Sequence, residues 1–184
     1  MDRASLCSPQ WDTSETGLFR TVIALNMFDE TPGAHRALGF GLFAGPDPGA
    51  PPGPDVWQFW FGDGTDFRPI KDPSRNSTPV DFTKTNYLAV TYDDTTKVLN
   101  MYVYVQGIDL DSGVGHPGKD VTVAAYSLIA DPTRSLLIGM HHPSVGSSIP
   151  LFHPFKGAIQ EVAVFSQALT MGRVMSHIMA GLKI

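Results

Sequence analysis

The stretch "LAVTYDDTTKVLNMYVYVQG", residues 88–107, decides the fold class of this chain. Its side chains alternate in polarity on both sides of a polar break at residues 93–97, which predicts two strands joined by a turn. One face of the second strand is apolar. The other face carries Tyr102, Tyr104 and Gln106. A half-polar strand face of this kind either binds a ligand or is covered by another part of the molecule.

The same alternation recurs along most of the chain. It appears in "LFRTVIALNMF" (residues 18–28), "DVWQFWFGDG" (55–64), "VTVAAYSLI" (121–129) and "AIQEVAVFS" (158–166). A helical period appears once, in "ALTMGRVMSHIMAGL", with Thr170 as its N-cap. Eight or more strands separated by turn residues predict an all-β fold. We expect a two-sheet antiparallel jelly-roll sandwich with a short C-terminal helix.

Length and composition set further limits. A chain of 184 residues with 42% hydrophobic and 17% charged residues fits one domain, 1–184, of which residues 1–16 are expected to form a loose N-terminal segment. The net charge is −5 and the basic residues are scattered, which argues against nucleic acid as a partner. Cys7 is the only cysteine, so no internal disulfide forms.

No apolar run is long enough to span a membrane, and the N-terminus lacks the apolar core of a signal peptide. We therefore expect no membrane partner. The location stays unknown, because the chain is either cytoplasmic or a module excised from an exported protein.

The C-terminal half resembles the laminin G-like domains of the concanavalin A-like lectin and glucanase superfamily. The matching positions are Tyr92, Asp93, Gly107, Ile138, Gly139, Phe155, Gly157, Ile159, Glu161, Val162, Ala168 and Leu169. Gln160 departs from the pattern, which has Asp there. The resemblance implies a jelly-roll sandwich that serves as a carbohydrate- or protein-binding module, in some members with a calcium ion held in a loop.

A glycan site is the first functional hypothesis. Aromatic rings stack on the apolar faces of sugars, and amide and imidazole groups hydrogen-bond to hydroxyls. If the central strands share one concave face, the stacking residues are Trp60, Tyr102 and Tyr104. The polar contacts would then come from Gln58, Gln106, Asn26 and His141. The same mixture suits a covering role without a ligand.

Two other functions stay open. A polysaccharide lyase on this scaffold would combine His141, Tyr102, Tyr104 and Arg20. A hydrolase needs two carboxyl groups about 5 Å apart, whereas the glutamates, at positions 15, 30 and 161, are widely separated. The third possibility is a protein-interaction domain of a larger assembly. We lean toward a module that is not an enzyme, and the sequence identifies neither the ligand nor the oligomeric state.

Two Gly-containing loops offer oxygen ligands of the kind that calcium prefers. They carry Asp63 and Asp66 in one loop and Asp109 and Asp111 in the other. Asp is also favoured in such turns by its own backbone hydrogen bonds. The sequence therefore makes calcium a candidate cofactor, with a plain turn as the alternative.

Overall fold

The structure is a computed structural model. It describes residues 5–9, 18–29, 36–46, 55–64, 67–71, 80–107, 121–122, 128–129, 134–140 and 152–182. The described chain is mostly antiparallel β-sheet with one short helix, which confirms the all-β prediction. Within these residues no helix has the length and hydrophobicity of a membrane span.

One sheet, the β6–β7 sheet, has five strands. In spatial order they are β11 (Gly157–Gln160), β1 (Ser5–Pro9), β6 (Asn86–Asp93), β7 (Val98–Val105) and β8 (Val121–Thr122). The pairing of β6 with β7 confirms the hairpin predicted from residues 88–107. Lys97, with a φ of 56°, takes the left-handed conformation at the end of its turn.

The other sheet, the β3–β4 sheet, has six strands. Its order is β10 (Phe152–Pro154), β2 (Phe19–Asp29), β3 (Arg36–Pro46), β4 (Asp55–Gly62) and β5 (Phe67–Lys71), with β9 (Leu137–Ile138) also paired to β2. β10 runs parallel to β2, and the other pairs are antiparallel. A register shift between Thr21 and Ile23 interrupts the alternation that the sequence showed in β2.

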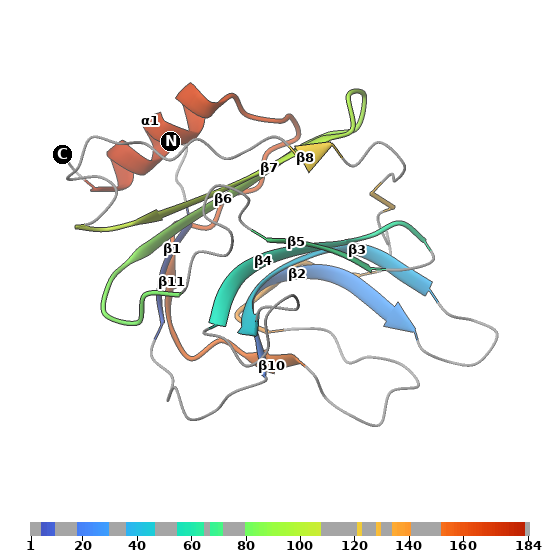
Figure 1. The fold of residues 1–184 in the computed structure, drawn as a ribbon, viewed down its shortest axis with the longest axis horizontal. Helices are drawn as coiled ribbons and strands as arrows, with labels where there is room; N and C mark the ends of the chain where they lie inside the picture. Colours follow the sequence, from blue (N-terminus) through green and yellow to red (C-terminus); the bar gives the residue numbers. More distant parts are fainter. Residues whose placement is uncertain are drawn as a thin grey trace.

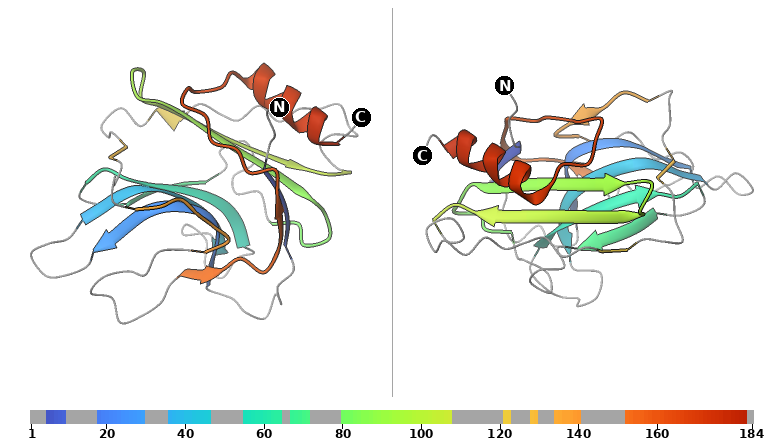
Figure 2. Two further views of the ribbon diagram at one scale, coloured as in Figure 1. Left: turned by 180° about the vertical axis from the view of Figure 1, so that it is seen from behind. Right: turned by 90° about the horizontal axis from the view of Figure 1, so that it is seen from above.

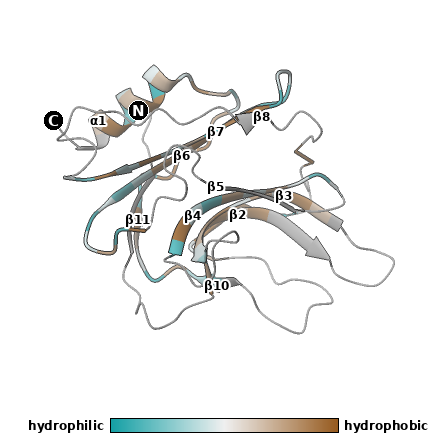
Figure 3. Cartoon of the chain, viewed as in Figure 1, coloured by the Kyte–Doolittle hydropathy of each residue, from teal (hydrophilic) through white to brown (hydrophobic). Residues whose placement is uncertain are grey.

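The two sheets lie one above the other, and the main core fills the layer between them (Figure 1). From β4 the core takes Trp57, Phe59 and Phe61, and from β7 it takes Leu99, Met101 and Val103. These residues alternate along their strands, so each strand turns one face into the layer. Hydrophobic residues recur along the strands of both sheets (Figure 3).

The helix α1 (Met171–Leu182) covers the outer face of the β6–β7 sheet (Figure 2). Its buried Val174 and Ile178 pack against Tyr102 and Tyr104 of β7. Thr170 caps the helix as predicted, since its Oγ1 accepts a hydrogen bond of 3.4 Å from the backbone N–H of Arg173. The half-polar face of β7 therefore packs against a helix.

Two expectations need correction, and a third can be compared with the structure only in part. Residues 5–9, inside the segment predicted to be loose, form β1 and pair with both β6 and β11. The strand predicted over residues 121–129 is tested only at its ends: Val121–Thr122 form β8, residues 128–129 are not in a strand, and the residues between lie outside the described part of the chain. The strand predicted over residues 158–166 ends at Gln160, because Glu161 adopts a φ of 55° and leaves the extended conformation.

Candidate functional site

The predicted sugar-binding surface is not formed, because its aromatic residues lie in different sheets. Trp60 of β4 pairs with Gly41 and Pro69 in the β3–β4 sheet. Tyr102 of β7 pairs with Ala89 of β6 in the other sheet. Alternation along a strand fixes which residues share a face, but it does not tell which strands are neighbours. The prediction of one continuous surface was therefore wrong.

The two tyrosines are also covered. Tyr102 is 4% exposed and Tyr104 is fully buried, and both pack beneath α1 in a second hydrophobic cluster with Tyr87. Rings in this position cannot stack on a sugar without displacement of the helix. Their role in the structure is to hold α1 on the sheet.

Gln58 and Trp60 lie together on the face of β4 that points away from the main core. The indole Nε1 of Trp60 donates a hydrogen bond of 3.0 Å to the Oε1 of Gln58. The Nε2 of Gln58 donates to the carbonyl oxygens of Gly45 and Pro46, at 3.2 and 2.8 Å. Gln58 is fully buried, so its amide is already committed to the protein.

Trp60 belongs to an aromatic cluster rather than to an open platform. Its ring makes edge-to-face contacts with Phe19 and Phe43, with centroid distances of 5.2 and 6.0 Å. Gly41 leaves room for the ring of Phe43, since a Cβ there would lie 2.3 Å from the ring atom Cζ. Trp60 keeps part of its surface exposed.

The other predicted residues are dispersed. Gln106 is exposed in the turn after β7, and Asn26 of β2 lies opposite Gly39 of β3. Arg20 of the lyase hypothesis is buried in β2, in the sheet that does not contain the two tyrosines. His141 of the sugar-binding and lyase hypotheses lies outside the described residues, as do Asp66, Asp109 and Asp111 of the calcium loops.

Asp63 is half-buried at the end of β4. In the described part of the chain, no group of three or more His, Cys, Asp or Glu side chains is placed to hold a metal ion. The calcium hypothesis therefore gains no support from the residues that the structure places.

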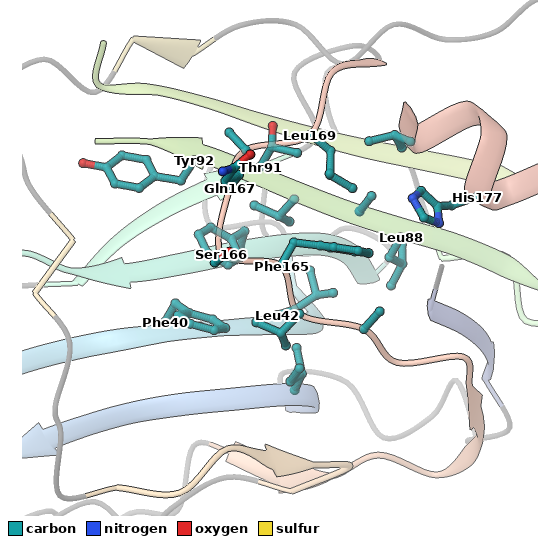
Figure 4. Close-up of a pocket in the computed structure, with 18 of the residues that line it drawn as sticks. Phe40, Leu42, Leu88, Thr91, Tyr92, Phe165, Ser166, Gln167, Leu169 and His177 are labelled. Carbon is teal, nitrogen blue, oxygen red and sulfur yellow. The ribbon is translucent and has the colours of Figure 1, made fainter. Parts of the chain in front are cut away.

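A pocket between the two sheets was not predicted from the sequence. We call it the inter-sheet pocket, and its volume is about 300 Å³. Its floor is the inner face of the β3–β4 sheet, formed by Ile23, Phe40, Leu42 and Phe59. One wall is residues 88–92 of β6, and the opposite wall is residues 163–169, with Val174 and His177 of α1 beside them. Figure 4 shows Phe165, Ser166 and Gln167 on the segment that crosses from the level of the β3–β4 sheet to that of the β6–β7 sheet before α1.

The lining is mostly apolar, with a few polar groups. Thr91 and Tyr92 lie on β6, Ser166 and Gln167 on the opposite wall, and His177 at the helix. The Tyr92 hydroxyl donates a hydrogen bond of 2.7 Å to the Oδ1 of Asp94. Burial raises the pKa of Tyr92 above 10.0, with a further upward contribution from Asp94, so the phenol stays a neutral donor at physiological pH.

The chemistry of this pocket suits binding. The His177 ring lies 5.3 Å from the Phe165 ring, in a tilted arrangement. No described hydrogen bond joins a nucleophile and a base among the lining residues, which are dominated by aliphatic and aromatic side chains. Apolar pockets of this size with a few polar groups are typical of ligand-binding sites.

Two stretches of the sequence form walls of the pocket, and the alternation in one of them indicated a strand instead. "EVAVFS", residues 161–166, alternates as a strand does and was predicted to continue the strand that begins at residue 158. In the structure these residues are not in a strand, and residues 163–169 form an irregular wall of the pocket. The left-handed backbone of Glu161 produces this difference, and a glutamate gives no warning of it. The contiguous Leu88, Ala89 and Val90 were the better sign, because a run of apolar residues in a strand indicates two covered faces.

Comparison of the chain with protein-family models, with curated proteins and with solved structures finds no significant match.

Proposed function

We propose that this domain is a non-catalytic binding module whose ligand occupies the inter-sheet pocket. The observation that carries the proposal is the pocket itself: about 300 Å³, floored by Ile23, Phe40, Leu42 and Phe59, with few polar groups on its walls. Removing apolar surface of a ligand from water supplies about 25 cal/mol per Å². The ligand is therefore expected to be apolar over most of the part that enters.

The laminin G-like relationship and the jelly-roll connection form part of the same proposal. They are supported by the resemblance of the C-terminal motifs and by two glycines within them. Gly139 and Gly157 have φ values of 75° and 139°, a region that residues with a Cβ avoid. Both positions thus use the freedom that made glycine part of the motif.

Dye binding to matched variants tests the pocket. A neutral naphthalene dye should bind to the wild-type protein with a rise in fluorescence, because the pocket shields it from water. Ala163 lines the pocket, so the variant Ala163→Trp should weaken dye binding by about tenfold or more. Ala180 is exposed on α1 and does not line the pocket, so Ala180→Trp is the control. Equal binding to both variants, or none to the wild type, would refute the proposal.

A glycan ligand is the second candidate, and the partial exposure of Trp60 is the observation that favours it. The other proposed stacking residues are unavailable to it, so one ring would supply the stacking. A glycan array should then detect binding that Trp60→Leu abolishes while the variant stays folded. If the array detects nothing, or if the substitution leaves binding unchanged, this candidate fails.

A further inference from the structure

The ladder between β1 and β6 stops before β6 ends. Ser5 lies opposite Leu88, Leu6 opposite Tyr87 and Cys7 opposite Asn86, whereas β6 continues to Asp93. On its other side β1 pairs with β11, where Leu6 lies opposite Gln160. β1 is thus sandwiched between β6 and β11. No described strand pairs with residues 89–93 of β6 at the edge where β1 pairs with residues 86–88.

Beyond Leu88, the backbone of β6 carries hydrogen-bonding groups at this edge that no described strand pairs with. In a strand the N–H and C=O groups of successive residues point alternately to the two edges. The N–H of Gln106 donates to the carbonyl of Thr85 across the β6–β7 side, at 2.9 Å. By alternation, the groups of Val90 and Tyr92 point to the opposite edge. Within the described residues no backbone partner is seen for these two.

The inter-sheet pocket lies at this same edge. Leu88, Val90 and Tyr92 line it, and the facing wall is residues 163–169, which follow β11 in the chain. Because β1 separates β6 from β11, the walls begin about two strand spacings apart, roughly 10 Å. Glu161 then turns the chain out of the ladder, so the wall does not close on β6. The opening is therefore shaped for one extended segment.

We propose that the ligand of the pocket is an extended apolar peptide, which binds as an added strand antiparallel to β6 and in line with β1. This inference rests on the proposed function. Strand addition to a free edge is a recurrent mode of peptide recognition, in which the backbone supplies affinity and alternate side chains supply specificity.

Backbone polarity favours a peptide over a small hydrocarbon. A hydrocarbon in this pocket would remove water from the N–H and C=O groups of Val90 and Tyr92 without replacing the lost hydrogen bonds. An added strand satisfies both residues by extending the ladder that Ser5 and Leu88 begin. Continuity with this ladder also fixes the direction of the peptide.

The surroundings predict the sequence of the peptide. Alternate side chains on one face would meet the floor at Phe40, Leu42 and Phe59, and those on the other face would meet Leu169 and Val174. Since both faces are apolar, the peptide should carry a continuous run of four or five aliphatic residues rather than an alternating pattern.

The end of the opening predicts a charge preference. An antiparallel peptide begins near the end of β6, where Asp93 and Asp94 lie and Lys97 provides one opposing charge through a contact of 2.6 Å with Asp94. The remaining negative charge favours lysine over glutamate just before the apolar run, most strongly at low ionic strength.

The experiment compares labelled peptides by fluorescence anisotropy, using the full chain. The first peptide has two lysines followed by Val-Ile-Val-Ile-Val. The second has the same side chains but carries N-methyl groups at alternate residues, which remove the N–H donors needed for pairing with β6. We expect at least tenfold weaker binding of the N-methylated peptide. A peptide with two glutamates in place of the lysines should bind several-fold more weakly at low salt.

Hydrogen exchange gives an independent readout. Binding of the first peptide should slow amide exchange at Val90 and Tyr92, whereas Thr91, whose groups point to β7, should change little. A ligand that merely fills the pocket would not produce this alternating pattern. Uniform slowing along residues 89–92 would therefore overturn the strand-addition proposal.

The remaining outcomes separate the two proposals. If the dye binds and the two Val-Ile peptides bind equally, or neither binds, the pocket function stands and strand addition is overturned. If neither dye nor peptide binds, the pocket function fails as well. If the peptide binds only after residues 1–4 are deleted, the position belongs to the chain's own preceding segment, which also overturns the proposal.

Discussion

The indole Nε1 of Trp57 donates a hydrogen bond of 3.1 Å to the side-chain oxygen of Asn86, and this bond joins the two sheets across the core. Trp57 lies on β4 and Asn86 begins β6, and both are fully buried. The amide nitrogen of Asn86 also donates to the backbone carbonyls of Asp81 and Lys84, each at 2.9 Å. One side chain thus fixes the sheet spacing and the loop that enters β6.

The first prediction concerns this bond. Asn86→Leu should lower the free energy of unfolding by about 2–4 kcal/mol, because it removes three hydrogen bonds and leaves the Trp57 donor buried without a partner. Trp57→Phe removes only one of these bonds, so the loss of hydrogen bonding should lower the free energy of unfolding less than in Asn86→Leu. The smaller ring also leaves a small cavity, which adds to the cost. Urea unfolding at equilibrium measures both. Equal costs would show that the loop bonds contribute little.

The second prediction compares two glycines that differ in the space available for a Cβ atom. A Cβ at Gly62 would lie 2.3 Å from the backbone carbonyl group of Ala37, so Gly62→Ala should destabilise the protein by about 1–3 kcal/mol. A Cβ at Gly172, in the first turn of α1, meets nothing within 4 Å. Gly172→Ala should stabilise the protein by roughly 0.5 kcal/mol. Thermal unfolding of the two variants measures whether each substitution raises or lowers stability. A loss of stability in Gly172→Ala would contradict the expectation for that position.

The third prediction tests how α1 is held. Ile178 is 1% exposed against the tyrosines of β7, whereas the adjacent Met179 is 40% exposed. Ile178→Ala should cost about 2–4 kcal/mol, because it opens a cavity in a packed layer. Met179→Ala should change stability by less than about 0.5 kcal/mol. Limited proteolysis should release the helix from the Ile178 variant first. Similar losses in both variants would mean that the helix is not docked on this face.

The fourth prediction concerns pH. The backbone N–H groups of Thr96 and Thr95 donate to the Asp93 carboxylate and hold its pKa below 3.8. Because the folded pKa is depressed, the charged carboxylate stabilises the hairpin above the unfolded value and loses this effect as pH falls through the folded value. Asp93→Asn should therefore be less stable than wild type at neutral pH, and the two should converge in acid.

Urea midpoints measured from neutral pH to well below 3.8 would follow this convergence. A difference that stays constant over the whole range would mean that the carboxylate charge does not hold the turn. Asp94 has its own depressed pKa, caused first by Lys97 and then by Tyr92, so wild type and variant share its titration.

Local features were predictable from the sequence to a large extent. The hairpin of β6 and β7, the N-cap Thr170 and the buried side of α1 each depend on residues close together in the chain, where alternation and capping preferences act directly. The prediction that Trp60 and Tyr102 share one surface was wrong. Which strands are neighbours depends on long-range pairing, which alternation does not encode.

The pocket could not be predicted for a different reason. Its shape depends on where β1 stops relative to β6 and on one backbone torsion at Glu161. No residue preference predicts either feature. Glutamate in particular is an ordinary strand or helix residue and gives no indication of a left-handed backbone. Helix cover over Tyr104 was equally hidden, because a tyrosine face looks the same whether it meets water or a helix.

The end of β11 depends on the backbone torsion at Glu161. A left-handed glutamate is held at a cost of about 1 kcal/mol, which the surrounding contacts must balance. Residues 163–169, which line the pocket, follow Glu161 in the chain, so a rotation of φ at this residue to the extended region would redirect them. The place of the pocket wall is therefore set by one backbone torsion.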